Sequence, residues 1–172
     1  MARERDGTMA AGFHEDVAAP PDDGVRPRLL VADGDPAFRR AVYYLLAGSG
    51  FEVTGVEDGR DAVLALDRSW REERPFEILL LELRIGEVSG WDVLRHARES
   101  VPGGRRIPRV LLVTGLVAAM DFGRARREGA SGLLLKPVSC DALLAEVGRL
   151  ERIPREVLPV NQRGVRMPAP TG

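Results

Sequence analysis

The sequence predicts an α/β domain built on a five-stranded parallel sheet. Between residues 28 and 152, short apolar segments alternate with amphipathic helical segments five times, a pattern typical of repeated strand–helix units. One of these segments, Ile78–Leu81, has no polar position at all, as expected of a strand covered on both faces. Several apolar segments end in a single polar residue. Open α/β sheets place their chemistry at the carboxyl ends of the strands, so this pattern also predicts where a functional site lies.

The composition limits the classes of protein to consider. The chain has 172 residues, 44% hydrophobic and 30% charged, which fits one globular domain with appendages. Its net charge of −1 and the lack of a basic stripe interleaved with aromatics predict no nucleic-acid partner. We expect no membrane association, because no apolar run approaches the ~18 residues of a membrane span and no signal-peptide core is present. The single cysteine, Cys140, excludes an internal disulfide and favours a cytoplasmic protein.

Three regions are predicted along the chain. Residues 1–26 mix Gly, Pro, Ala and acidic side chains without periodicity, so we expect a disordered N-terminal arm. Residues 27–152 carry all the periodic segments and form the domain. Residues 153–172 contain four prolines and no hydrophobic period, which predicts a flexible, Pro-rich C-terminal tail.

The first half of the domain supplies clear boundary signals. A strand over 28–32 is followed by Asp35 and Pro36, a helix cap with proline at the first helical position. The helix then runs to residue 47, before a Gly-Ser-Gly stop. A strand over 51–56, a helix over 58–67 and a charged connection over 70–75 complete this half.

The second half repeats the pattern. After the strand over 78–81 and a glycine-containing loop, a helix is predicted over 89–99. Strands over 109–113 and 132–135 each precede a helix, over 118–128 and 139–150 respectively. The helix over 118–128 is mostly polar, whereas the one over 139–150 is amphipathic.

Four polar residues are predicted to meet at one edge of this sheet. Right-handed crossovers bring the carboxyl ends of parallel strands together, and these ends carry Asp33, Glu82, Thr114 and Lys136. Lys136 is the only lysine among 25 basic residues, which suggests a position that needs a compact cation. The set suits phosphoryl chemistry, with a carboxylate acceptor, a second acid for Mg²⁺, and Thr and Lys on the phosphoryl oxygens.

These segments resemble the receiver domain of response regulators, the CheY-like family. The matching pieces are LLVADGDPAFRR, ILLLELRIGEVSG, LLVTG and GASGLLLKPVS, in that order along the chain. The resemblance implies a (βα)5 flavodoxin-like three-layer sandwich and a role in two-component or phosphorelay signalling rather than as an enzyme. It also implies contacts with a histidine kinase or a downstream effector through the surface of 118–128, 132–135 and 139–150, a surface that receivers also use to form homodimers.

The sequence departs from this family at the positions that carry its chemistry. Glu82 stands where the phosphoacceptor Asp is expected, and Gly34 replaces a metal-binding acid beside Asp33. Leu133 replaces the switch aromatic, whereas Thr114 and Lys136, the phosphoryl contacts, match. A glutamate reaches about 1.5 Å farther than an aspartate, and a misplacement of about 1 Å can cost a factor of ~10² in group transfer.

We therefore expect a stand-alone atypical receiver, a pseudo-receiver, that works through protein contacts without conventional phosphorylation. Glu82 would be a fixed charge paired with Lys136. We expect no resident cofactor and at most a weakened Mg²⁺ site at Asp33 and Glu82. Three arginines, Arg124, Arg126 and Arg127, form either a solvated helix face or the patch that contacts the partner.

Three alternatives stay open from the sequence. The first is a single-domain receiver that still accepts phosphate from a histidine kinase. The second is that Glu82 and Lys136 form a merely structural ion pair. The third is a haloacid-dehalogenase-type phosphatase, whose motif Asp33 and Asp35 resemble, although Ala37 and Phe38 do not continue it.

Overall fold

The computed structural model describes residues 26–103, 105–115 and 122–152. The expected arm over 1–26, apart from Arg26, and the expected tail over 153–172 lie outside these ranges, as do the first four residues of the expected helix over 118–128.

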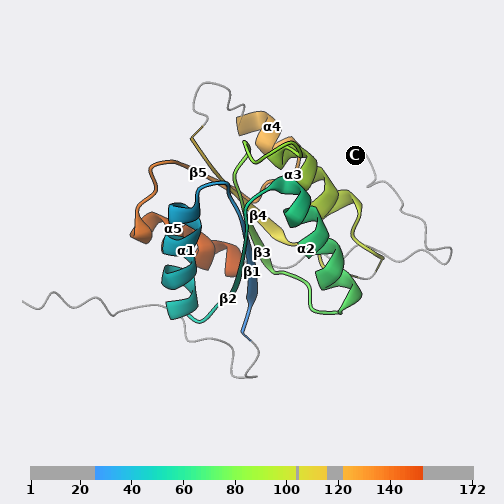
Figure 1. Ribbon diagram of the computed structural model, residues 1–172, viewed down its shortest axis with the longest axis horizontal. Coiled ribbons are helices and arrows are strands. Elements are labelled where there is room, and N and C mark those ends of the chain that lie inside the picture. The colour runs from blue at the N-terminus through green and yellow to red at the C-terminus, as the bar shows by residue number, and fades with distance from the viewer. Residues whose placement is uncertain (1–25, 104, 116–121, 153–172) are drawn as a thin grey trace, which may run out of the picture.

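Five strands alternate with five helices (Figure 1). The elements are β1 (Arg28–Ala32), α1 (Pro36–Gly48), β2 (Glu52–Val56), α2 (Gly59–Arg71), β3 (Ile78–Leu81), α3 (Gly90–Glu99), β4 (Arg109–Thr114), α4 (Phe122–Arg127), β5 (Gly132–Leu135) and α5 (Cys140–Glu151). Among the described residues, no helix is both long and apolar enough to cross a membrane.

The strands form one parallel sheet in the order β2-β1-β3-β4-β5. Helices α1 and α5 lie on one face and α2 and α3 on the other, which makes three layers (Figure 1). The predicted five-stranded parallel α/β sandwich is therefore confirmed.

Alternate residues of the central strands fill two cores, as the two-residue period of a strand requires. Leu30, Leu79 and Leu112 pack under α2 and α3, together with Ala125 of α4. Residues one position earlier or later along the same strands pack against α1 and α5. Burial on both faces explains why β3 and β4 read as continuous apolar runs.

The helices start where their caps predict. Asp35 accepts hydrogen bonds from the backbone N–H groups of Ala37 (2.8 Å) and Phe38 (3.3 Å), so its predicted capping role is confirmed. Side chains of Asp58, Ser89 and Ser139 cap α2, α3 and α5 in the same way.

One boundary was wrongly predicted from the sequence. Helix α2 extends to Arg71, whereas the prediction ended it at Asp67 and placed Trp70 in a connection. Trp70 is buried and belongs to the core beneath α3, with its ring 5.7 Å from that of His96. The packing of this large ring adds a turn to the helix that the charged sequence around it does not indicate.

Candidate functional site

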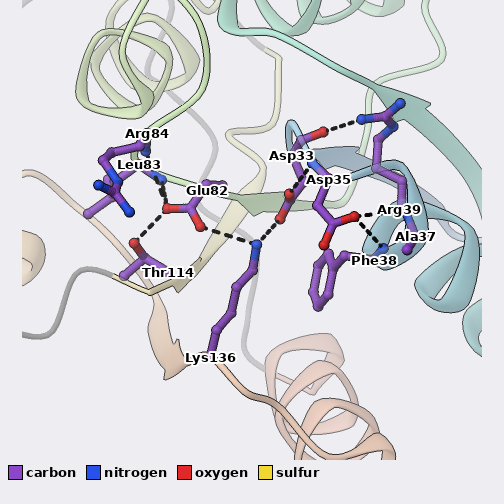
Figure 2. A network of polar contacts seen from close by, with 10 residues as sticks. All are labelled: Asp33, Asp35, Ala37, Phe38, Arg39, Glu82, Leu83, Arg84, Thr114 and Lys136. Carbon is purple, nitrogen blue, oxygen red and sulfur yellow. Dashed lines mark hydrogen bonds and ion pairs between the residues drawn. The ribbon is translucent and has the colours of Figure 1, made fainter.

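The strand register brings the polar strand ends together. Ala32 of β1 lies opposite Leu81 of β3, and the N–H of Glu82 donates to the carbonyl of Ala32 at 2.9 Å. Asp33 and Glu82 are therefore neighbours on adjacent strands. On the other side of β3, the N–H of Lys136 donates to the carbonyl of Thr114 at 2.9 Å. All four residues singled out from the sequence meet at this edge (Figure 2).

Lys136 bridges the two carboxylates (Figure 2). Its Nζ lies 2.7 Å from Oδ2 of Asp33 and 3.2 Å from Oε2 of Glu82. The expected pair with Glu82 is present, but the shorter contact is with Asp33. The ring of Phe38 lies against the ammonium, 4.4 Å from Nζ to the ring centroid.

The Glu82 carboxylate is enclosed by hydrogen-bond donors. Its Oε1 accepts from the hydroxyl of Thr114 at 2.6 Å and from the backbone N–H groups of Leu83 (2.8 Å) and Arg84 (3.2 Å). Its Oε2 takes the ammonium of Lys136. Because the side chain folds back on the chain that follows it, the carboxylate is buried rather than extended into solvent.

Asp33 is also held in place by protein donors. Its side chain is buried, and its Oδ1 accepts the N–H of Asp35 at 2.9 Å. Its backbone carbonyl accepts from Nη1 of Arg39 at 2.7 Å. Because Oδ2 of Asp33 binds the ammonium of Lys136, both of its carboxylate oxygens are occupied by protein donors.

Opposing effects act on the titration of Glu82 and Lys136. Burial by itself would raise the pKa of Glu82, but the hydrogen bonds from Thr114, the Arg84 amide and Lys136 outweigh it and lower the pKa below the ordinary 4.5. Burial likewise would lower the pKa of Lys136, but Asp33 and Glu82 raise it above the ordinary 10.5. The ionised forms of both groups are therefore favoured at neutral pH.

Two glycines let the backbone around Glu82 pack tightly. A Cβ on Gly90, at the start of α3, would lie 2.5 Å from the carbonyl oxygen of Glu82. A Cβ on Gly59, at the start of α2, would lie 2.0 Å from the carbonyl oxygen of Val88. Between them, Gly86 has φ +66, a conformation that favours glycine. The loop that follows Glu82 is consequently fixed against two helices.

The donor set is poor for a metal ion. No group of three or more His, Cys, Asp or Glu side chains with metal-binding geometry occurs in the described ranges. The two nearest carboxylates, Asp33 and Glu82, share Lys136 as a common partner. Gly34 is exposed and supplies no ligand atom of its own side chain.

The other predicted positions lie away from this cluster. Leu133 is partly buried and packs against the core under α2 and α3. Arg124 stacks over Trp91 at 4.2 Å and lies 3.8 Å from Glu128, so it is partly committed within the domain. Arg126 and Arg127 are exposed on α4.

Phe38 and Arg39 are part of the site but were not predicted from the sequence to belong to it. Both belong to the first turns of α1 and contact the site, through the Lys136 ammonium and the Asp33 carbonyl respectively. Their spacing after the Asp35 cap was visible, but nothing in the sequence indicated that this turn faces Lys136.

Comparisons with known proteins show the family. Residues 29–148 match the family described as response regulator receiver domain. The DNA-binding response regulator MtrA of Mycolicibacterium smegmatis is 31% identical over 153 residues, covering 86% of this chain and 62% of MtrA. The regulatory protein AlgB of Pseudomonas putida is 34% identical over 125 residues, covering 72% of this chain and 26% of AlgB. The chain spans less than two thirds of these relatives' lengths.

Solved structures agree on the fold. The chemotaxis protein CheY4 of Vibrio cholerae superposes with a TM-score of 0.60 at 21% identity, covering 73% of this chain and 99% of that one. A response regulator from Thermotoga maritima gives 0.61 at 24% identity, covering 73% and 98%. The chain belongs to the response regulator receiver domain family. Receiver domains of this family belong to the response regulators of two-component signalling.

Proposed function

We propose that this receiver works without a phosphorylation cycle, with Glu82 as a built-in negative charge. The observation that carries the proposal is the arrangement of donors around its carboxylate. The Thr114 hydroxyl, the Leu83 and Arg84 amides and the Lys136 ammonium all bind it. The resemblance of this chain to receivers implies that Thr114 and Lys136 are the groups that would hold the phosphoryl oxygens in a phosphorylated domain.

The same contacts oppose chemistry at Glu82. An acceptor carboxylate must point an oxygen at the incoming phosphorus along the line of transfer. Here Oε1 is held by three donors and Oε2 by Lys136, so attack would first break these hydrogen bonds. Charge-assisted hydrogen bonds are about twice as strong as neutral ones, which makes this cost substantial.

We further propose that the site works without Mg²⁺. Lys136 supplies the positive charge between Asp33 and Glu82, and Gly34 provides no additional carboxylate. A divalent ion would have to displace the ammonium and retain most of its own water ligands.

The surface formed by α4, β5 and α5 would then keep one conformation, because no phosphorylation changes the site. Position 133 holds a leucine that packs against the core. The chain therefore has no aromatic side chain there to move when Thr114 moves. We propose that α4, β5 and α5 contact a kinase, an effector or a second copy of the chain, with Arg126 and Arg127 exposed on α4. DNA binding, which the printed name of MtrA states for that protein, is not part of this proposal.

Incubation with acetyl phosphate and Mg²⁺, followed by intact mass spectrometry, tests this proposal. We expect no phosphoryl adduct on the wild-type chain. The matched control is the double variant Glu82→Asp with Gly34→Asp, which restores the short acceptor and the second acid, and which we expect to gain an adduct. A stoichiometric, hydroxylamine-labile adduct on the wild-type chain, lost in Glu82→Gln, would establish the alternative of a phosphorylation-competent receiver.

A further inference from the structure

An arginine-rich hollow of about 360 Å³ lies at the opposite end of the sheet from Glu82. It borders the beginning of β1 and the segment that leads into β3. The arginine hollow is defined by Arg26, Arg28, Arg74, Arg105 and Arg106 around Phe76. Its acidic lining residues are Glu73 and Glu77, so arginines outnumber acids. Such a surface attracts carboxylates or phosphates.

Three of these arginines are already engaged. Arg28 and Arg74 both bind Glu52, at 2.8 Å each, and Arg28 also stacks over Phe76 at 4.5 Å. Arg105 binds Glu73 at 2.7 Å. These ion pairs fix the walls of the arginine hollow and occupy guanidinium N–H groups of the three arginines.

The remaining two arginines are available. Arg26 and Arg106 are exposed, and neither side chain has an ion pair or hydrogen bond within the described ranges. Glu73 does not neutralise them, since it is taken by Arg105. The arginine hollow therefore presents two guanidinium groups with unused donors.

Acidic residues stand only a few positions before Arg26 in the sequence. Residues 1–25 contain six acidic and two basic side chains, and Asp22 and Asp23 lie a few residues before β1. A chain spans at most about 3.6 Å per residue, so the Cα atoms of Asp23 and Asp22 stay within about 11 and 14 Å of that of Arg26. This range is close to the Debye length of about 8–10 Å. Their effective concentration at the arginine hollow is therefore on the order of millimolar or above.

We infer that the acidic segment 15–23 docks in the arginine hollow, with Asp22 and Asp23 on the guanidinium groups of Arg26 and Arg106. The contact is intramolecular and independent of the chemistry at Glu82. It competes with any external anion for the arginine hollow. An external phosphate compound is the other occupant of suitable charge, but it lacks the tether.

NMR on the full-length ¹⁵N-labelled chain tests the inference. The variant Asp22→Asn with Asp23→Asn removes both carboxylates, and Arg106→Glu reverses the charge of the receiving side chain. The matched control, Glu4→Gln with Asp6→Asn, removes the same charge far from Arg26. We expect high {¹H}–¹⁵N NOE values for residues 22–25 in the wild type and the control, and loss of them in both test variants and at about 0.5 M sodium chloride. Combining Arg26→Glu and Arg106→Glu with Asp22→Arg and Asp23→Arg should restore them, because both charge pairs are then reversed.

Inorganic pyrophosphate provides the second measurement. Followed at the amides of Arg105–Ile107, it should bind the Asp22→Asn, Asp23→Asn chain about tenfold more tightly than the wild type, since the tethered competitor is gone. Equal pyrophosphate affinity in the two chains would mean that the arginine hollow is a site for external anions and would overturn the inference. Low and unchanged NOE values over residues 22–25 in all variants would overturn it as well.

Discussion

At the scale of single residues, the site depends on one extra methylene. The longer side chain lets the Glu82 carboxylate turn back onto the amides of Leu83 and Arg84 while still reaching Thr114 and Lys136. We expect an aspartate at the same position, one methylene shorter, to lack the reach for all four donors. The carboxylate of Glu82 is thus an internally satisfied ion.

The hydroxyl of Thr114 should control the charge of Glu82. Thr114→Val keeps the shape of the strand but removes a 2.6 Å hydrogen bond to a buried carboxylate. We expect the pKa of Glu82 to rise and the free energy of unfolding to fall by about 2 kcal/mol. The ¹³C chemical shift of the Glu82 carboxyl, followed against pH, and urea unfolding measure the two effects. An unchanged titration would show that Thr114 does not stabilise the ionised form.

At the scale of elements, the Glu82 loop is positioned by the starts of α2 and α3. The N–H of Gly90 donates to the carbonyl of Leu83 at 2.9 Å, and that of Gly59 to the carbonyl of Ile85 at 3.3 Å. These close approaches require the absence of a Cβ at both helix starts. The helices therefore fix the amides that bind Glu82.

Gly90→Ala should disturb this arrangement. The added Cβ would meet the Glu82 carbonyl oxygen at 2.5 Å, so we expect a loss of about 1–3 kcal/mol in urea unfolding and shifted amide resonances for Leu83 and Arg84. Gly148→Ala in α5 is the control, because nothing lies within 4 Å of its added Cβ. That change should instead stabilise the helix by about 0.5–1 kcal/mol. Equal effects of the two substitutions would contradict the close packing inferred at Gly90.

The elements were largely predictable, whereas the contacts between their side chains were not. Strand positions and the Asp35 cap follow from local patterns, and the convergence of Asp33, Glu82, Thr114 and Lys136 follows from parallel topology. The preference of Lys136 for Asp33 depends on strand register and side-chain reach, which no local pattern encodes. The extra turn of α2 around Trp70 likewise depends on a core formed with distant residues.

At the scale of the whole molecule, the site links stability to pH at both ends of the range. The pKa of Glu82 is lowered in the folded state, so its contribution is present above about pH 4.5 and is lost as pH falls through the folded value. The pKa of Lys136 is raised, so its contribution is present below about pH 10.5 and is lost as pH rises through the folded value.

Thermal unfolding across this range measures the linkage. We expect Lys136→Met with Glu82→Gln to flatten both flanks of the melting-temperature profile relative to the wild type, because neither group then titrates. Arg68→Met, at an exposed cation in the last turn of α2, is the control and should leave the profile unchanged in shape. A double variant with the wild-type profile would place the pH dependence elsewhere.

The bridge made by Lys136 also bears on how the chain reaches its native state. Lys136 and Asp33 are separated by 103 positions, so the salt bridge closes only after β5, the last strand, has joined the sheet. Until then β1 and β3 bring two carboxylates side by side with no cation between them, an arrangement that like-charge repulsion opposes. A nascent or truncated chain that ends before Lys136 would leave this edge of the sheet loose and hydrated. The ion pair thus couples closure of the site to completion of the fold.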